Sequence, residues 1–170
     1  MDFALTQDQE MIRATAEAFL ADASPSAAVR QAMQTAEGFD AHTWSQVGEE
    51  LGWCATAIPE EFGGLGLTII EQAILMEQMG KRLFCSPYFA TACLAATALL
   101  EVGTPEAKQR HLPAIASGAL TATLAFGEHG LDWNANAVTT IAKPTVGGYC
   151  LDGCFRHVPD GTSAQLLLVT

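Results

Sequence analysis

The chain has 170 residues, enough for one ordinary domain, or for one domain and part of another, around a buried hydrophobic core. Its formal net charge of −11, from 19 acidic against 8 basic residues, repels nucleic-acid phosphates and anionic lipid headgroups, so we expect no nucleic-acid partner and no membrane role. Hydrophobic residues make up 49% of the chain and charged residues only 16%, which favours association with another subunit or with further sequence.

Three helices are predicted in the first third of the chain. Apolar residues in 5–20 follow helical spacing, and Thr6 with Gln9 forms a capping box at the start of this helix. A weaker, alanine-rich stretch over residues 26–35 predicts a second helix. A third helix is expected to stop before Pro59. Its apolar face is made of Trp44, Val47, Leu51, Cys54 and Ala55.

A glycine-rich turn over residues 57–66 separates these helices from the next ones. It combines Pro59 with three closely spaced glycines, which permit positive φ and close backbone approach. Thr68 and Glu71 then form a second capping box, which predicts a helix ending at Gly80.

Two further helices are predicted before residue 118. The stretch 88–102 is apolar on almost every side, so we expect it to be buried. Thr104 and Pro105 suit the N-cap and first turn of a helix through His111, after which a short turn closes at Gly118.

Beyond Gly118 the pattern changes to short strands. The segments 120–126, 137–143, 149–155 and 166–169 are richer in threonine and β-branched residues and are separated by Gly, Pro, Asn and Asp. Gly147 and Gly148 are predicted to make a hairpin turn, and Pro144 confines its strand to an edge. The predicted fold class is therefore mainly α followed by β, and so few strands are expected to be incomplete by themselves.

The cysteines, the histidines and the known short motifs give no chemistry of their own. Five scattered cysteines predict reduced thiols in a cytoplasmic protein. Cys150 and Cys154 lack a second Cys/His pair at zinc spacing, and no H-E-x-x-H occurs, so no metal site is predicted. The sequence also lacks a Rossmann glycine motif, a Walker loop and G-x-S-x-G. The amino terminus has the pattern of neither a signal peptide nor a transmembrane helix.

Four segments carry a resemblance to a known family. They are residues 3–10 (FALTQDQE), 58–66 (IPEEFGGLG), 103–118 (GTPEAKQRHLPAIASG) and 124–128 (LAFGE). Each alone has a simpler explanation, such as a capped helix or a glycine turn, but their joint order makes coincidence improbable. In that order they resemble the amino-terminal half of acyl-CoA dehydrogenases. The resemblance implies a helical N-terminal domain over residues 1–118, the start of an incomplete β-barrel middle domain over 119–170, and no C-terminal helical bundle.

The resemblance implies a flavoenzyme. In this family FAD lies between the middle β domain and a C-terminal helical bundle, and acyl-CoA or a related acyl thioester lies against the flavin. The implied reaction is α,β-dehydrogenation, in which a carboxylate base removes the α proton while hydride leaves the β carbon. In most members the base is a glutamate of the C-terminal domain, so no catalytic residue is predicted in this chain. The implied partners are an electron-transfer acceptor protein and further subunits of a homo- or hetero-oligomer.

The flavin contacts of the family carry over only in part. The matching cofactor-binding positions are Leu124, Phe126 and Gly127 on one strand and His157, Val158 and Pro159 on a second segment. Main-chain groups of the first strand and an aromatic ring at His157 are expected to contact the flavin. The family commonly has threonine at the positions of Gly127 and Pro159, so two hydrogen-bond donors are lost. An unmatched partner in a buried polar site costs on the order of 1–3 kcal/mol, which weakens flavin binding.

The substrate positions carried over from the family are Thr91, Ala95 and Trp133. Residues 88–102 resemble the helix that closes the acyl pocket, and small residues there leave room for a ligand chain or serve close helix packing. Trp133 falls on a loop that meets substrate in the family, although a loop tryptophan is also typical of an interface. Two functions remain open: part of a completed dehydrogenase, or a non-catalytic acyl-binding or interaction subunit that has lost its flavin contacts. An unrelated helical domain with a β extension requires all four matches to be accidental.

Overall fold

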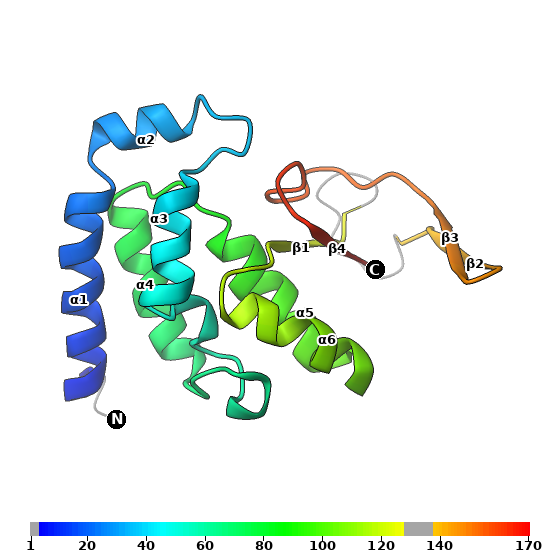
Figure 1. Cartoon of the computed structure of the whole chain (residues 1–170), viewed down its shortest axis with the longest axis horizontal. Coiled ribbons are helices and arrows are strands. Elements are labelled where there is room, and N and C mark those ends of the chain that lie inside the picture. Colours follow the sequence, from blue (N-terminus) through cyan, green and yellow to red (C-terminus); the bar gives the residue numbers. More distant parts are fainter. Residues whose placement is uncertain (1–3, 128–137) are drawn as a thin grey trace.

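The computed structural model describes residues 4–127 and 138–170. The α-helices are α1 (Gln7–Ala23), α2 (Ser26–Ala32), α3 (Ala41–Ser45), α4 (Ile69–Lys81), α5 (Ala96–Val102) and α6 (Pro105–Ala116). Two π-helical segments, η1 (Gln46–Glu50) and η4 (Phe89–Ala95), and two 3-10 turns, η2 (Trp53–Ala55) and η3 (Glu60–Phe62), lie among them. The strands are β1 (Ala122–Ala125), β2 (Ile141–Thr145), β3 (Gly148–Asp152) and β4 (Leu166–Val169). Helices therefore fill one part of the molecule, and the strands lie at one side of it (Figure 1).

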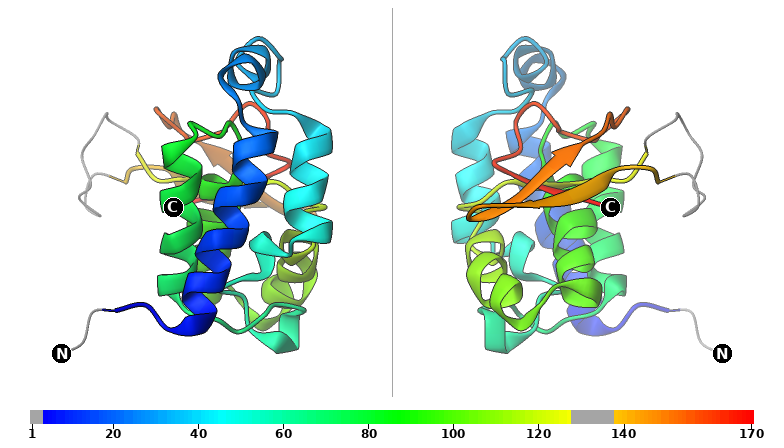
Figure 2. Two further views of the ribbon diagram at one scale, coloured as in Figure 1. Left: turned by 90° about the vertical axis from the view of Figure 1, so that its left-hand side faces the viewer. Right: turned by 90° about the vertical axis from the view of Figure 1, so that its right-hand side faces the viewer.

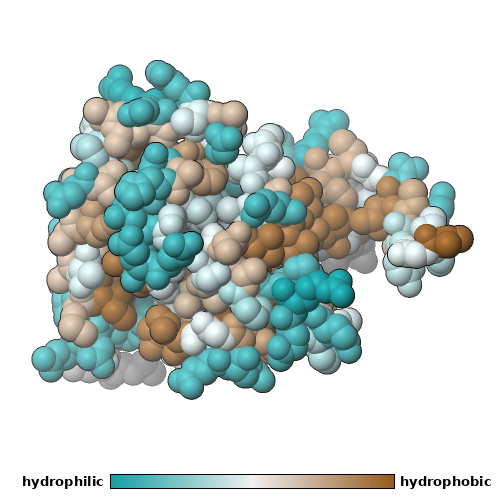
Figure 3. Space-filling model, viewed as in Figure 1, coloured by the Kyte–Doolittle hydropathy of each residue, from teal (hydrophilic) through white to brown (hydrophobic). Residues whose placement is uncertain are grey.

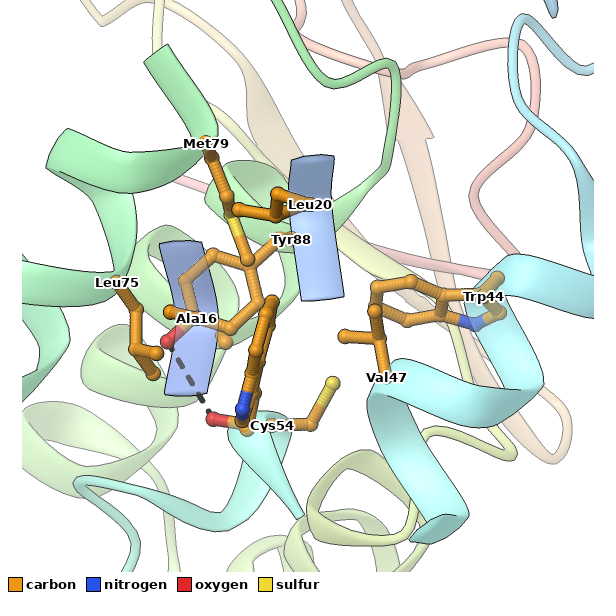
Figure 4. Close-up of a cluster of buried hydrophobic side chains, with 10 residues drawn as sticks. Ala16, Leu20, Trp44, Val47, Cys54, Leu75, Met79 and Tyr88 are labelled. Atoms are coloured by element: carbon orange, nitrogen blue, oxygen red, sulfur yellow. Dashed lines mark hydrogen bonds between the residues drawn. The ribbon is translucent and has the colours of Figure 1, made fainter. Parts of the chain in front are cut away.

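Two hydrophobic clusters hold the helices together. The first lies between α1, α4 and the segment around η2, where the fully buried Tyr88 packs beside Leu20 and Leu75 (Figure 4). The second lies under α5 and α6 and includes Leu99, Leu112, Ile115 and Ala122, with Leu166 and Leu168 of β4 packed against it. The β1–β4 pair therefore shares its core with the helices.

Both predicted capping boxes are confirmed, and they are joined to each other. The Glu71 carboxylate accepts hydrogen bonds from the Thr68 main-chain N–H at 2.8 Å and from the Thr68 hydroxyl at 2.5 Å. Its other oxygen accepts from the Gln9 side-chain amide at 2.7 Å, and Gln9 itself caps α1 through Thr6. Donation by the Thr68 hydroxyl, followed by Gln9, lowers the pKa of Glu71 from 4.5 to about 2. One carboxylate thus ties the starts of α1 and α4 together, and these two helices lie side by side in both views (Figures 1 and 2).

The prediction of one continuous third helix is wrong. α3 ends at Ser45, a π turn follows over η1, and Gly52 with φ of 64° breaks the chain before η2. The π turn also packs against a distant segment, because an added Cβ on Gly48 would lie 2.7 Å from the Gly118 Cα atom. The Trp44 indole also donates to the Gly118 carbonyl at 3.0 Å. The apolar face was nevertheless predicted well, since Trp44, Val47, Cys54 and Ala55 are buried.

Two later helices also differ from the predictions. The stretch 88–102 is helical, but its first part, η4, is a π helix that turns into α5 at Ala96. α6 does not stop at His111 and runs through Pro113 to Ala116. Burial of Leu112, Ile115 and Ala116 in the second cluster outweighs the hydrogen bond that Pro113 cannot donate. Gly118, with φ of 75°, follows the end of α6.

The glycine-rich turn is confirmed. Gly64 lies so close to the Ile58 carbonyl that a side chain has no space there. The Leu65 N–H donates to the Ala55 carbonyl and the Leu67 N–H to the Thr56 carbonyl, both at 2.9 Å, so the turn folds back onto η2.

The strands form two separate pairs in the described parts of the chain. β1 and β4 are parallel, with Ala122 opposite Leu166, while β2 and β3 form an antiparallel hairpin that projects away from the helices (Figures 1 and 2). The hairpin turn consists of Val146 and Gly147, one residue earlier than predicted, because Gly148 already pairs with Thr145. Within residues 4–127 and 138–170, no helix has the length and apolar character needed to cross a membrane.

We predict that Glu71→Gln lowers the free energy of unfolding by about 1–3 kcal/mol at pH 7, because an amide cannot accept all three bonds of the carboxylate. Since the folded-state pKa is depressed, the carboxylate stabilises the fold above pH 4.5, and this stabilisation is lost as the pH falls towards 2. Urea denaturation at several pH values should therefore show a difference between wild type and variant that shrinks with acidification. Glu77→Gln, which removes an exposed ion pair with Lys81, is the control and should change stability by under about 0.5 kcal/mol. Equal effects of the two substitutions would contradict the stabilising role that we assign to the Glu71 carboxylate.

Gly48→Ala should destabilise the protein by about 2 kcal/mol or more, because its new methyl group would meet the main chain of Ser117 and Gly118. Gly80→Ala is the matched control in α4, where nothing lies within 4 Å of an added Cβ. This control should leave stability unchanged or raise it by up to about 1 kcal/mol. Thermal melting of both variants measures the difference in stability. An unchanged melting temperature in Gly48→Ala would show that the close contact of Gly48 with the main chain of Ser117 and Gly118 is not needed.

Candidate functional site

The two segments predicted to face the flavin are brought together by the fold. The Arg156 N–H donates to the Gly127 carbonyl at 2.7 Å, and the Thr123 hydroxyl donates to the Pro159 carbonyl at 2.6 Å. The segment that follows β3 therefore runs alongside β1 and its continuation. Two segments that are distant in the sequence therefore lie side by side.

The predicted cofactor-binding residues differ in exposure. Gly127 is buried, His157 is exposed, and the other four, Leu124, Phe126, Val158 and Pro159, are partly buried. His157 adopts a φ of 56°, which turns the chain sharply before Val158. Pro159 has no N–H, and its carbonyl is already bonded to Thr123, so its main chain has less to offer a ligand than a threonine would.

A groove of about 660 Å³ lies between the α2–α3 connection and the strands, a size typical of small-molecule sites. Residues 35–38 form one wall. The opposite wall includes Ala125, Phe155, Val158, Leu167 and Val169. Of the predicted flavin residues, Val158 lines this groove. Figure 3 shows apolar residues gathered over the β1–β4 region and at the hairpin tip, where Val146 is fully exposed.

Asp160 is a groove residue that the sequence reasoning missed. Asp160 lines the groove together with Glu37, and burial raises the pKa of Asp160. Its backbone has φ of 50°, and its carbonyl accepts from the N–H groups of Ser163 at 3.1 Å and Ala164 at 2.9 Å. The Pro-Asp-Gly turn signal was present in the sequence, but the approach of residues 35–38 to this turn is a tertiary contact that no local pattern reveals.

The predicted substrate positions on η4 are inside the core. Thr91 and Ala95 are both completely buried. The Thr91 hydroxyl accepts from the Ala122 N–H at 3.0 Å and donates to the Ala122 carbonyl at 3.1 Å, so η4 and β1 are in direct contact. Close packing of η4 on β1 accounts for small residues at both positions in this chain. Trp133, the third predicted substrate position, lies outside the described residues.

The cysteines do not form a reactive centre. All five lie in the described ranges and are unpaired. Burial raises the pKa of Cys54 to about 12 and that of Cys93 to about 11, so both stay protonated and unreactive. In the part of the chain that the structure describes, no group of three or more His, Cys, Asp or Glu side chains is arranged to hold a metal ion.

The arrangement fits a flavin held through main-chain groups. β1 and the segment 155–159 lie side by side, and a groove of suitable size adjoins them. The hydroxyl donors expected beside a flavin are missing at Gly127 and Pro159. The two segments of the predicted site thus lie side by side, with fewer side-chain donors than the family commonly has.

Comparison with known proteins agrees with the resemblance seen in the sequence. The profile of the family described as "Acyl-CoA dehydrogenase, N-terminal domain" matches residues 6–119. The acyl-CoA dehydrogenase IpdE2 of Mycolicibacterium smegmatis is 36% identical over 122 residues, which cover 72% of this chain and 38% of that protein.

Solved structures show the same fold. A ChsE4-ChsE5 complex from Mycobacterium tuberculosis matches with a TM-score of 0.86 and 27% identity, over 99% of this chain and 45% of that chain. A variant of the Tcur3481-Tcur3483 steroid ACAD matches with a TM-score of 0.84 and 28% identity, over 96% of this chain and 44% of that chain. This chain therefore spans less than half the length of these relatives.

Proposed function

The chain belongs to the acyl-CoA dehydrogenase family, and from this premise we propose that it supplies the amino-terminal part of an FAD-dependent acyl-thioester dehydrogenase. The observation that carries the proposal is the contact between β1 and the segment 155–159, through the Arg156–Gly127 and Thr123–Pro159 hydrogen bonds. The substrate class is acyl-CoA or a related acyl thioester. The reaction is α,β-dehydrogenation.

The residues of this chain have a binding role in the proposal. Main-chain groups of Leu124, Phe126 and Gly127 would hold the flavin ring, and His157 and Val158 would contact it from the second segment. Bound FAD supplies the hydride acceptor. The catalytic base comes from outside this chain, as in most members of the family. Ala95 is completely buried and therefore supports the helix wall from inside the core. Trp133, which lies outside the described residues, stays a proposed substrate contact.

The proposed partners follow from the family and from the shape of the chain. The matched chain of the ChsE4-ChsE5 complex is more than twice as long as the part that this chain covers. The occurrence of such a complex among the relatives supports a hetero- or homo-oligomer. Leu167, Val169, Tyr149 and Leu151 are exposed apolar residues on the strands, and further sequence or a further subunit would cover them. An electron-transfer protein is the proposed acceptor. The unpaired cysteines support a cytoplasmic location.

A second function is favoured by one specific observation. Gly127 and Pro159 stand where the family commonly has threonine, so two hydroxyl donors are missing, and Pro159 also lacks an N–H. The loss of these donors favours a non-catalytic acyl-binding or interaction subunit that keeps the fold without the cofactor. Tight binding of an acyl thioester by a flavin-free assembly would support this alternative.

The proposed function is tested by flavin content and turnover. We expect the purified chain alone to give no acyl-CoA turnover with an artificial electron acceptor. Assembly with the sequence or subunit that supplies the rest of the fold and a base glutamate should give a flavin absorbance spectrum and acyl-CoA-dependent reduction. Turnover by the chain alone, or an assembled protein without flavin, would contradict the proposal.

Pro159→Thr should strengthen FAD binding by the assembled protein about five-fold or more, because it restores one N–H and one hydroxyl donor where each hydrogen bond contributes about 1 kcal/mol. Equilibrium titration of the apoprotein with FAD measures the change. Pro144→Thr makes the same substitution on the exposed strand β2 and should leave FAD affinity unchanged. If Pro159→Thr has no effect either, the segment does not contact the flavin as proposed.

A further inference from the structure

Thr91 makes an unusual pair of contacts for a residue in the middle of a buried helix. Its side chain is completely buried, and its one hydroxyl is bonded to both main-chain groups of Ala122. Thr91 lies in the π-helical segment η4, and the Gln72 amide donates to the Ala92 carbonyl of the same segment at 3.0 Å. Single π turns inside helices occur frequently at functional sites.

The Ala122 groups lie on the edge of β1 that faces away from β4. The Thr121 carbonyl accepts from the Leu166 N–H, and the Ala125 carbonyl accepts from the Thr170 N–H, so odd-numbered residues of β1 point their main chain towards β4. Even-numbered residues point theirs to the opposite edge. In the described ranges no strand pairs with that edge. The Thr91 hydroxyl bonds the N–H and the carbonyl of Ala122, which a neighbouring strand would otherwise do. Without a hydrogen-bond partner these two buried groups would destabilise the fold.

The same edge leads to the predicted flavin positions. Leu124 follows Ala122 two residues later in β1, so its main-chain groups face the same way. Phe126 comes just beyond the end of the strand. Thr91 therefore fixes this edge against η4, which also carries Ala92 and Ala95. The Thr91 hydroxyl thus bonds this edge of β1 directly to η4.

We propose that Thr91 is a positioning residue, whose hydroxyl holds the flavin-facing edge of β1 in place against the helix that lines the proposed acyl site. This inference rests on the proposed function. It assigns Thr91 a role through Ala122 and β1 instead of direct contact with substrate, because its hydroxyl hydrogen is already committed to the Ala122 carbonyl.

The test compares three variants of the assembled, flavin-binding protein. Thr91→Val keeps the shape of the side chain and removes the hydroxyl, whereas Thr91→Ser keeps the hydroxyl and removes a methyl group. Thr56→Val is the matched control, because Thr56 is also buried and donates its hydroxyl to the Trp53 carbonyl at 2.7 Å, away from β1. The readouts are the dissociation constant for FAD and the flavin absorbance maximum, measured at a temperature where each variant is folded.

We expect Thr91→Val to weaken FAD binding by about ten-fold or more and to shift the flavin spectrum, because the loss of two hydrogen bonds frees the strand edge. Thr91→Ser should bind FAD as wild type does, and Thr56→Val should lower thermal stability without changing FAD affinity. Unchanged FAD affinity in Thr91→Val, or equal losses in Thr91→Ser and Thr91→Val, would overturn the positioning role. Absence of FAD from the wild-type assembly would instead refute the proposed function.

If Thr91→Val does not fold, amide exchange in the wild-type assembly decides the question. The Ala122 amide should then exchange slowly although no strand covers its edge in the described parts of the chain. Protection of this amide should be retained in Thr91→Ser. Fast exchange at Ala122 in wild type would contradict the hydroxyl contact itself.

Discussion

Three threonine hydroxyls join β1 and the residue before it to the neighbouring segments. Thr91 serves Ala122, the Thr123 hydroxyl binds the Pro159 carbonyl, and the Thr121 hydroxyl donates to the Ser163 carbonyl at 3.0 Å. Buried N–H and C=O groups need such partners, and β1 has a strand on one edge only in the described residues. These contacts join the helices, β1 and the segment after β3 into one unit, on which the proposed flavin site depends.

Features with a local cause could be read from the sequence. The capping boxes at Thr6 and Thr68 were predicted because their side chains bond to residues two or three positions away. The close contact of Gly48 with Gly118 could not be predicted, since it joins residues that are far apart in the sequence. The end of α6 was misplaced because packing of its last turn outweighs the effect of Pro113.

The candidate site shows the same division between local and distant causes. The order of the two flavin-like segments was visible in the sequence, and the fold brings them together through Gly127 and Arg156. The groove beside Val158, the carboxyl group of Asp160 in it and the double contact of Thr91 with Ala122 depend on approaches between distant residues. Family resemblance located the strand and placed Thr91 at a substrate position, but it did not reveal the hydroxyl contact with Ala122. The exposed apolar residues of the strands agree with a chain that spans less than half the length of its relatives.

A solved structure of the assembled protein with FAD would test the central claim most directly. The measured quantity is the distance from the main-chain atoms of Phe126 and Gly127 to the pyrimidine edge of the flavin ring. Our account predicts hydrogen-bond distances there, with His157 beside the ring and the Thr91 hydroxyl still bonded to Ala122. A flavin ring bound elsewhere, away from β1, would contradict it.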